Sequence, residues 1–250
     1  MDLPYKELDV DNYKKAFNKD EKLVNKYFNN IEKSEQQKFL EELLKKSGFK
    51  NRNIEIADIG CGGGKASFHL NQLYNKANYN LLDYNEKAIE IAKNINKDKN
   101  FSFEVGNIYN LPYKEDSFDL TVCLVVVSFI ENAQKAIDEL IRVTKKNGRI
   151  IISALINFDH DVDLLTKVLD KTRDSSKDNL YLIYNTFSKT TFDEWISSKI
   201  SNLKYYKFIT EKDFIYDGKG INTYTINTEN EKIQLAGGMK LNWGFIDIIK

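Results

Sequence analysis

Cysteine, proline and histidine are scarce in this sequence, with only two of each among 250 residues. Two thiols, Cys61 and Cys123, cannot form a disulfide framework, and no Cys/His spacing typical of a zinc site is present. We therefore expect no metal ion and a reducing, cytoplasmic setting. The N-terminal 20 residues are rich in charge and lack an apolar core segment, so we expect no signal peptide.

An excess of one charge and long apolar runs are also missing. Lys+Arg and Asp+Glu both number 37, so the formal net charge is zero. Nucleic-acid binding usually requires a basic surface, and a balanced chain makes a DNA or RNA partner unlikely. No stretch approaches the roughly 18 consecutive apolar residues of a membrane span, so no span is expected.

What the sequence does contain is a regular alternation of short apolar runs and segments with helical periodicity. We expect strands over residues 54–59, 79–82, 101–105, 118–127 and 149–156, and intervening helices over 65–74, 86–96 and 132–145. Such alternation predicts an α/β three-layer sandwich around a mostly parallel sheet. No repeat or linker divides the chain, so we expect one domain over residues 1–250.

Both ends of the chain depart from this alternation. Apolar residues at helical spacing predict helices within residues 11–48. After residue 157 the pattern loosens, and we expect helices over 161–172 and 191–198. Alternating residues over 205–249 predict antiparallel strands at the edge of the sheet.

A glycine-rich turn, residues 58–64, closes the first expected strand and opens a helix. Glycines let a backbone turn sharply and let a ligand approach it closely. A phosphate-binding P-loop is excluded, because Ile59 occupies its first glycine position and Ala66 its Ser/Thr position. A dinucleotide fingerprint fits poorly, because Lys65 or Ser67 occupies its last glycine position. The remaining interpretations are an acidic-x-Gly-x-Gly-x-Gly ligand loop and a turn that binds nothing.

Asp83 ends the second expected strand, 23 residues after Gly60. A carboxylate there can accept hydrogen bonds from the ribose hydroxyls of a bound nucleoside. The alternative is a solvated turn residue. Tyr84, the next residue, is placed to pack on the edge of an adenine ring.

Two further runs complete the pattern: residues 105–119, which read VGNIYNLPYKEDSFD, and residues 139–149, which read ELIRVTKKNGR. With the glycine loop and Asp83, these runs resemble class I (Rossmann-like) S-adenosylmethionine-dependent methyltransferases of the ubiquinone/menaquinone, or type 11, group. The sequence departs from that group at Asn107, where the family has an acidic residue. It departs again at Lys146 and Asn147, where the family has Pro-Gly. An Asn carbonyl can still accept from an adenine amino group, and Asn tolerates a left-handed turn.

The resemblance implies a cofactor, S-adenosyl-L-methionine, and a product, S-adenosyl-L-homocysteine. It implies a division into an N-terminal helical lid (1–50), a cofactor-binding core (51–156) and an acceptor side with C-terminal strands (157–250). The residues it places at the cofactor are Asp58, Gly60, Cys61, Gly62, Gly64, Asp83, Tyr84, Asn107, Ile108 and Leu124.

The catalytic machinery is less marked. His160 stands between Asp159 and Asp161 just after the fifth expected strand, where a general base would suit a hydroxyl nucleophile. The alternative is that one of the two aspartates caps the helix expected over 161–172 and that His160 is simply exposed. Ser128 and nearby residues after the fourth strand would border the methyl group.

We expect methyl transfer to a small polar acceptor, a hydroxyl of a sugar, phosphorylated or amino-acid-like metabolite, with N-methylation a close variant. The C-terminal stretch faintly resembles methyltransferases encoded among bacterial surface-polysaccharide and natural-product genes. Alternatives are an RNA or protein methyltransferase of the same fold and a catalytically silent partner subunit. A nicotinamide-dependent reductase is disfavoured by the glycine spacing and by the lack of a Tyr-x-x-x-Lys pair.

Overall fold

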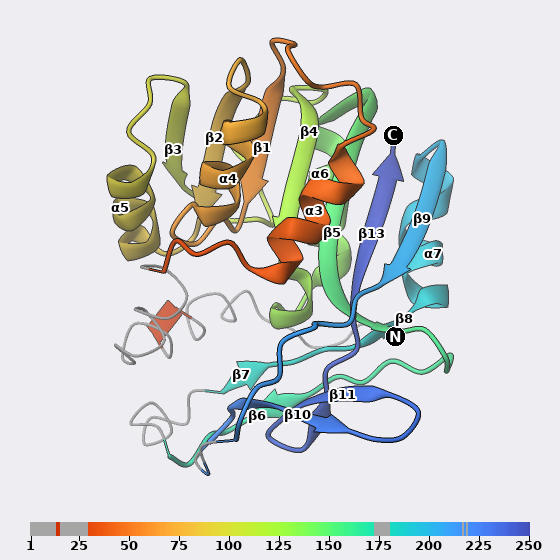
Figure 1. The fold of residues 1–250 in the computed structure, drawn as a ribbon. Helices are drawn as coiled ribbons and strands as arrows, with labels where there is room; N and C mark the ends of the chain where they lie inside the picture. Colours follow the sequence, from red (N-terminus) through yellow and green to blue (C-terminus); the bar gives the residue numbers. More distant parts are fainter. Residues whose placement is uncertain (1–13, 16–29, 173–180, 217, 219) are drawn as a thin grey trace.

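The computed structural model describes residues 14–15, 30–172, 181–216, 218 and 220–250, and its centre is a mixed eight-stranded sheet (Figure 1). The strand order is β3-β2-β1-β4-β5-β13-β9, with β8 also paired to β5. The strands are β1 (Glu55–Ile59), β2 (Asn78–Asp83), β3 (Phe101–Val105), β4 (Phe118–Leu124), β5 (Thr144–Asn157), β8 (Phe187–Ser188), β9 (Asn202–Lys207) and β13 (Trp243–Ile249). Strands β1 to β5 are parallel, whereas β13 runs antiparallel to both β5 and β9. The expected fold class, including the antiparallel C-terminal edge, is confirmed.

Helices cover both faces of this sheet. They are α3 (Glu35–Leu44), α4 (Lys65–Leu73), α5 (Glu86–Ile95), α6 (Ala133–Val143) and α7 (Lys189–Ile196). Apolar residues of α3, α4 and α5 pack with Ile151 of β5, whereas those of α6 and α7 pack with its neighbours Ile150 and Ile152. Because successive strand residues point to opposite faces, this division confirms the three layers. Leu40 and Leu44 of α3 are fully buried, so α3 belongs to the core.

Short strands lie beyond the carboxyl ends of β4 and β5, at the bottom of Figure 1. β6 (Lys167–Val168) pairs with β7 (Leu182–Ile183), and β10 (Thr223–Asn227), β11 (Lys232–Ala236) and β12 (Met239–Lys240) form a three-stranded sheet. Leu155 near the end of β5 packs with Leu182, Ile221, Ala236 and Leu241 of this layer. The expectation that the C-terminal strands extend the edge of the main sheet is therefore correct only for β9 and β13.

The prediction of a helix over residues 161–172 is wrong. The segment is extended, and Leu164 forms a β-bridge with Thr186 before β6 begins. The carboxylate of Asp163 accepts hydrogen bonds from the Ser188 amide (2.7 Å) and the Thr191 hydroxyl (2.7 Å), so it stabilises the start of α7. The helical spacing of the apolar residues was misleading, since Leu164 is 52% exposed.

Two turns of the core require left-handed backbone. Asn147 has φ 63°, which confirms the turn expected before the second half of β5. Val125 has φ 60°, and β4 therefore ends at Leu124 and not at residue 127 as expected. Most of the helix expected near the N-terminus lies outside the described residues. No described helix has the length and apolar character needed to cross a bilayer.

Candidate active site

The glycine loop connects β1 to α4 at the carboxyl edge of the sheet. Gly60, Gly62 and Gly64 have φ of 73°, 54° and 75°, a backbone region that side chains rarely tolerate. A Cβ on Gly60 would lie 2.4 Å from Cγ2 of Val126, and one on Gly64 would lie 2.5 Å from Nδ2 of Asn96. The loop thus lies directly against the exit of β4 on one side and the end of α5 on the other.

Asp83, the last residue of β2, holds this loop in place. Its Oδ2 accepts a hydrogen bond from the Gly62 amide at 2.8 Å, and its Oδ1 accepts one from the Asn85 amide at 2.9 Å. Burial raises the pKa of Asp83, and these backbone donors oppose the rise. Each carboxylate oxygen has a second lone pair, so Asp83 can support the loop and still accept from a ligand.

Asp58 lies behind the loop and is buried. Its Oδ2 accepts a hydrogen bond from the Ser67 hydroxyl at 2.7 Å. Burial raises the pKa of Asp58 to about 6, and the nearby charge of Asp83 adds to the rise. Burial likewise raises the pKa of the Cys61 thiol, which therefore stays protonated at neutral pH. The site consequently holds two carboxyl groups close together with no cation paired to either in the described structure.

The other expected cofactor residues lie along the same edge. The amide of Gly106, directly before Asn107, donates to the Asp83 carbonyl at 3.0 Å, which joins the end of β3 to that of β2. Asn107 Oδ1 accepts from the Tyr109 amide at 2.9 Å, so the Asn carbonyl already has one partner. Ile108 is buried, whereas Tyr84 and Leu124 are half-buried. Nζ of Lys14 lies 5.3 Å from the centre of the Tyr84 ring, which brings part of the N-terminal region to this edge.

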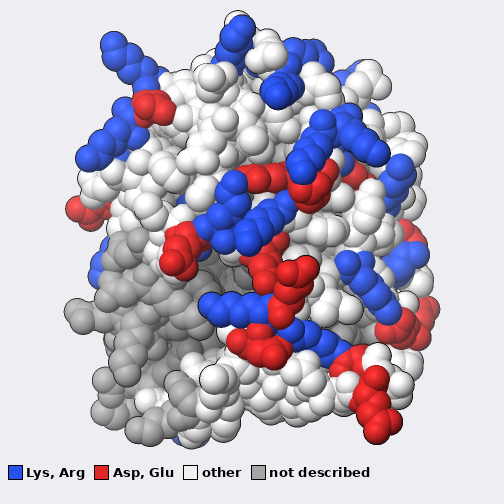
Figure 2. Space-filling model, viewed as in Figure 1, with Lys and Arg blue, Asp and Glu red and all other residues white. Residues whose placement is uncertain are grey.

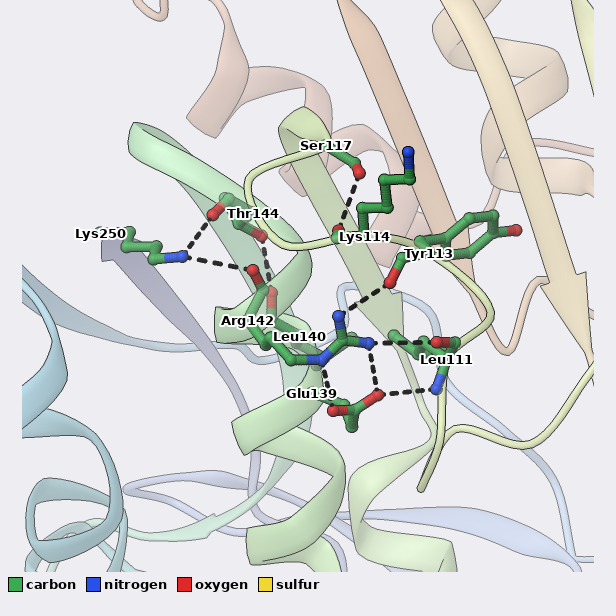
Figure 3. Close-up of polar contacts among 9 residues, drawn as sticks. All are labelled: Leu111, Tyr113, Lys114, Ser117, Glu139, Leu140, Arg142, Thr144 and Lys250. Atoms are coloured by element: carbon green, nitrogen blue, oxygen red, sulfur yellow. Dashed lines mark hydrogen bonds and ion pairs between the residues drawn. The ribbon is translucent and has the colours of Figure 1, made fainter.

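The loop before β4 is fastened from behind by α6 (Figure 3). Glu139 Oε2 accepts from the Leu111 amide at 2.7 Å, and Arg142 donates to the carbonyls of Leu111 (3.1 Å) and Tyr113 (2.8 Å). Glu139 and Arg142 also pair with each other, which lowers the pKa of Glu139. This role was not predicted from the sequence, although a Glu-x-x-Arg spacing on a helix is a recognisable pairing signal. Part of the sequence pattern over residues 105–119 therefore serves to stabilise the fold.

Asp119, the final residue of that run, also has a structural role. Its Oδ2 accepts from the Glu55 amide (2.9 Å) and from Nζ of Lys145 (2.8 Å). Glu55 begins β1, so these bonds lie at the amino edge of the sheet, opposite the glycine loop.

His160 is exposed and lies just beyond the end of β5, the position after the fifth strand that the sequence predicted. Its amide donates to Asn157 Oδ1 at 3.3 Å. The neighbouring Asp159 pairs with Lys207, which lowers the pKa of Asp159. Residues 161–172 form no helix, so neither aspartate caps one there, but His160 is exposed as that alternative expected. A catalytic role for His160 stays a prediction.

Residues after β4 join the site to the lower strands. Ser128 is fully buried: its Oγ accepts from the Leu155 amide at 2.8 Å and its carbonyl accepts from the Asn185 amide at 2.7 Å. Next to it, Phe129 meets the rings of Tyr184 (5.0 Å between centroids) and Trp243 (6.1 Å). No local sequence pattern predicts this aromatic cluster, because its members are far apart in the chain. This cluster packs the segment after β4 against residues near β7 and β13.

The family follows from comparison with known proteins. A family model described as a methyltransferase domain matches residues 50–213. The chain belongs to this methyltransferase family. The methyltransferase is 31% identical over 101 residues to norajmaline N-methyltransferase of Rauvolfia serpentina, covering 39% of this chain and 34% of the relative. It is 33% identical over 103 residues to the malonyl-[acyl-carrier protein] O-methyltransferase of Buchnera aphidicola, covering 41% and 40%. These matches span well under half the length of either relative.

The fold of the methyltransferase is also shared with solved structures. The 1,6-didemethyltoxoflavin-N1-methyltransferase of Burkholderia thailandensis, bound to S-adenosylhomocysteine, superposes with a TM-score of 0.59 at 12% identity. That match covers 100% of this chain and 93% of the other. The shared fold confirms the class I (Rossmann-like) methyltransferase fold that the sequence resemblance implied.

Proposed function

We propose that the enzyme methylates a small polar acceptor, a hydroxyl of a sugar, phosphorylated or amino-acid-like metabolite, between the carboxyl edge of the sheet and the lower strands. The observation that carries this proposal is the lower layer itself, where β6, β7 and β10–β12 cover the ends of β4 and β5. In open α/β sheets ligands bind beyond the carboxyl ends of the strands. A layer folded over that region favours a small, enclosed acceptor over a long polymer.

Charge supports the same proposal. The formal net charge is zero, and Figure 2 shows Lys, Arg, Asp and Glu side chains mixed across one face, with no large region of a single sign. An RNA substrate is typically bound through a basic surface. The family resemblance of the C-terminal region points to surface-polysaccharide or natural-product metabolism, and the two free thiols suit a cytoplasmic setting.

We further propose that the glycine loop, Asp58, Cys61, Asp83, Tyr84, Asn107, Ile108 and Leu124 hold S-adenosylmethionine. The donor set fits this cationic cofactor. The methionine part carries an ammonium group, which would neutralise the unpaired Asp58, and the ribose hydroxyls would donate to Asp83. The bound cofactor supplies an electrophilic methyl group on a sulfonium.

The chain's own part in the reaction is to position the acceptor in line with that methyl group. A hydroxyl acceptor also benefits from a base, and His160 is our candidate for taking its proton. An amine acceptor that is neutral when bound needs no such base. One named relative is an N-methyltransferase and the other an O-methyltransferase, so the acceptor atom can be nitrogen or oxygen.

Calorimetry tests the cofactor site first. The protein is titrated with S-adenosylmethionine and S-adenosylhomocysteine, with NADH and ATP as negative controls, and again as Asp83→Ala. Asp98→Ala is the matched control, because Asp98 is an exposed aspartate bonded to Asn71 away from the loop. We expect micromolar binding of both cofactor forms that is lost only in Asp83→Ala. Equal binding by both variants would contradict the assigned site.

The acceptor is tested with labelled S-adenosylmethionine against a panel of sugars, sugar phosphates, amino acids and amines, with transfer RNA and histone included. We expect transfer to a small molecule, and for a hydroxyl acceptor a lower kcat in His160→Gln without a change in cofactor affinity. Transfer only to RNA or protein would overturn the acceptor proposal. Cofactor binding without transfer to any compound would favour the silent-subunit alternative.

A further inference from the structure

Val125 has an unusual backbone for its residue type. It directly follows β4, has φ 60°, and is 39% exposed. A β-branched residue in the left-handed region is a true outlier and persists only where its surroundings enforce it. The free-energy cost of this backbone region for an L-residue has to be met by specific contacts.

A single hydroxyl provides the main contact. The Val125 amide is 3.0 Å from Oγ of Ser153 and 3.2 Å from the Ser153 carbonyl. Ser153 lies on β5, paired with Leu124, and is fully buried. Its Oγ in turn donates to Oε1 of Gln36, in the first turn of α3, at 3.0 Å. A chain of hydrogen bonds thus runs from α3 through β5 to the exit of β4.

The residue after Val125 meets the glycine loop. Val126 Cγ2 lies so near Gly60 that a Cβ there would be 2.4 Å away. If Val125 relaxed to a negative φ, the chain direction would change and Val126 would leave this contact. The conformation of Val125 therefore controls how the β4 exit and the glycine loop fit together.

We propose that Ser153 is a positioning residue for the cofactor: its hydroxyl holds Val125 in the left-handed conformation, keeps Val126 against Gly60, and so preforms the cofactor site. Gln36 orients that hydroxyl and couples α3 to the site. The inference rests on the proposed function in one respect, that the glycine loop binds S-adenosylmethionine. It predicts that a residue behind the site, without contact to the cofactor, governs cofactor affinity.

The test measures S-adenosylhomocysteine affinity by calorimetry and the melting temperature of each variant. Ser153→Ala should weaken binding by about tenfold, the order of one lost hydrogen bond. Thr144→Val is the matched control: it removes a fully buried hydroxyl from the same strand, bonded to Thr121 and Leu140 at the other end. It should lower the melting temperature without changing affinity.

A second-site variant separates positioning from plain packing. Asn adopts left-handed backbone more readily than Val, so Val125→Asn in the Ser153→Ala background should recover most of the affinity. Gln36→Ala, on the partly exposed side of α3, should weaken binding in the same direction by a smaller factor. This variant keeps the test valid if Ser153→Ala fails to fold.

The outcomes are distinct. Wild-type affinity in Ser153→Ala and Gln36→Ala, with binding lost in Asp83→Ala, would overturn the positioning role and leave the site in place. Equal weakening by Thr144→Val, or no recovery with Val125→Asn, would also overturn it, because both indicate a general packing effect. Wild-type affinity in Asp83→Ala as well would instead show that the proposed site is misplaced.

Discussion

The Asp83 carboxylate accepts the Gly62 amide at 2.8 Å, so the residue that ends β2 also fixes the loop that follows β1. This contact brings a second carboxyl close to Asp58. Burial raises the pKa of Asp58, hydrogen bonds from Ser67 oppose the rise, and the charge of Asp83 adds to it. Burial and this second carboxyl both disfavour the ionised form of Asp58, so we expect a cationic ligand to stabilise that form.

Cofactor affinity should depend on pH near 6. The pKa of Asp58 is about 6 in the free protein, and binding of an ammonium group favours its ionised form. Affinity for S-adenosylhomocysteine should therefore fall as pH is lowered through 6, by up to about tenfold per pH unit. Calorimetry from pH 5 to 8 measures this, with buffers of different ionisation enthalpy reporting proton release. Asp58→Asn should remove the pH dependence; a flat profile in the wild type would contradict the assignment.

The stability of the free protein should change with pH in the opposite direction to cofactor affinity. The pKa of Asp58 rises from an ordinary 3.8 to about 6 on folding, so folding favours the protonated form. Its contribution is fully present below about pH 3.8 and is lost as pH rises through 6. Asp58→Asn should thus be more stable than wild type at pH 7.5, with the difference shrinking towards pH 4.5. Urea unfolding at the two pH values measures it, and a constant difference would count against the raised pKa.

Gly60 and Gly48 form a matched pair for the glycine loop. Both have φ 73°, but a Cβ on Gly48 meets nothing within 4 Å, whereas one on Gly60 meets Val126. Gly48→Ala should cost about 1–2 kcal/mol of stability, the price of left-handed backbone alone, with cofactor affinity unchanged. Gly60→Ala should cost more and abolish cofactor binding. Adding Val126→Ala to Gly60→Ala should recover part of the stability, and absence of any recovery would argue against the contact.

The hydrogen bonds from Glu139 and Arg142 to the loop before β4 should raise the free energy of unfolding. Arg142→Ala removes charged hydrogen bonds to two backbone carbonyls and should cost about 2–3 kcal/mol in urea unfolding. Arg142→Lys should recover little, because Lys lacks the planar fork. On the same helix, Asp138→Ala breaks only an exposed pair with Lys199 and should cost under about 1 kcal/mol. Equal losses of stability in Arg142→Ala and Asp138→Ala would show that the Arg142 hydrogen bonds contribute no more than an exposed ion pair.

Much of the core could be predicted from sequence because each element there buries its own regular pattern. Buried β4 and β5 read as apolar runs, and α6 presents a single apolar face. The turn at Asn147 was predictable as well, since few residues accept a φ of 63°.

The failures share a physical cause: the deciding partner is distant in the chain. Asp163 stabilises the start of α7, 25 residues on, and not a helix of its own. Glu139 and Arg142 bind backbone groups about 30 residues away, and Phe129 meets the rings of the distant residues Tyr184 and Trp243. Val125 shows no local sign of its left-handed backbone, because the hydroxyl that holds it belongs to β5. Local pattern cannot report such contacts.

The position of β13 has a consequence for synthesis. This strand comes after every other strand in the chain, yet it lies between β5 and β9 and pairs with both. While the ribosome is still making residues before 243, β9 has no neighbour and β5 presents an open edge along its apolar residues. Open edges invite pairing with other chains. We therefore expect the nascent chain to be most prone to aggregation until β13 emerges and pairs with β5.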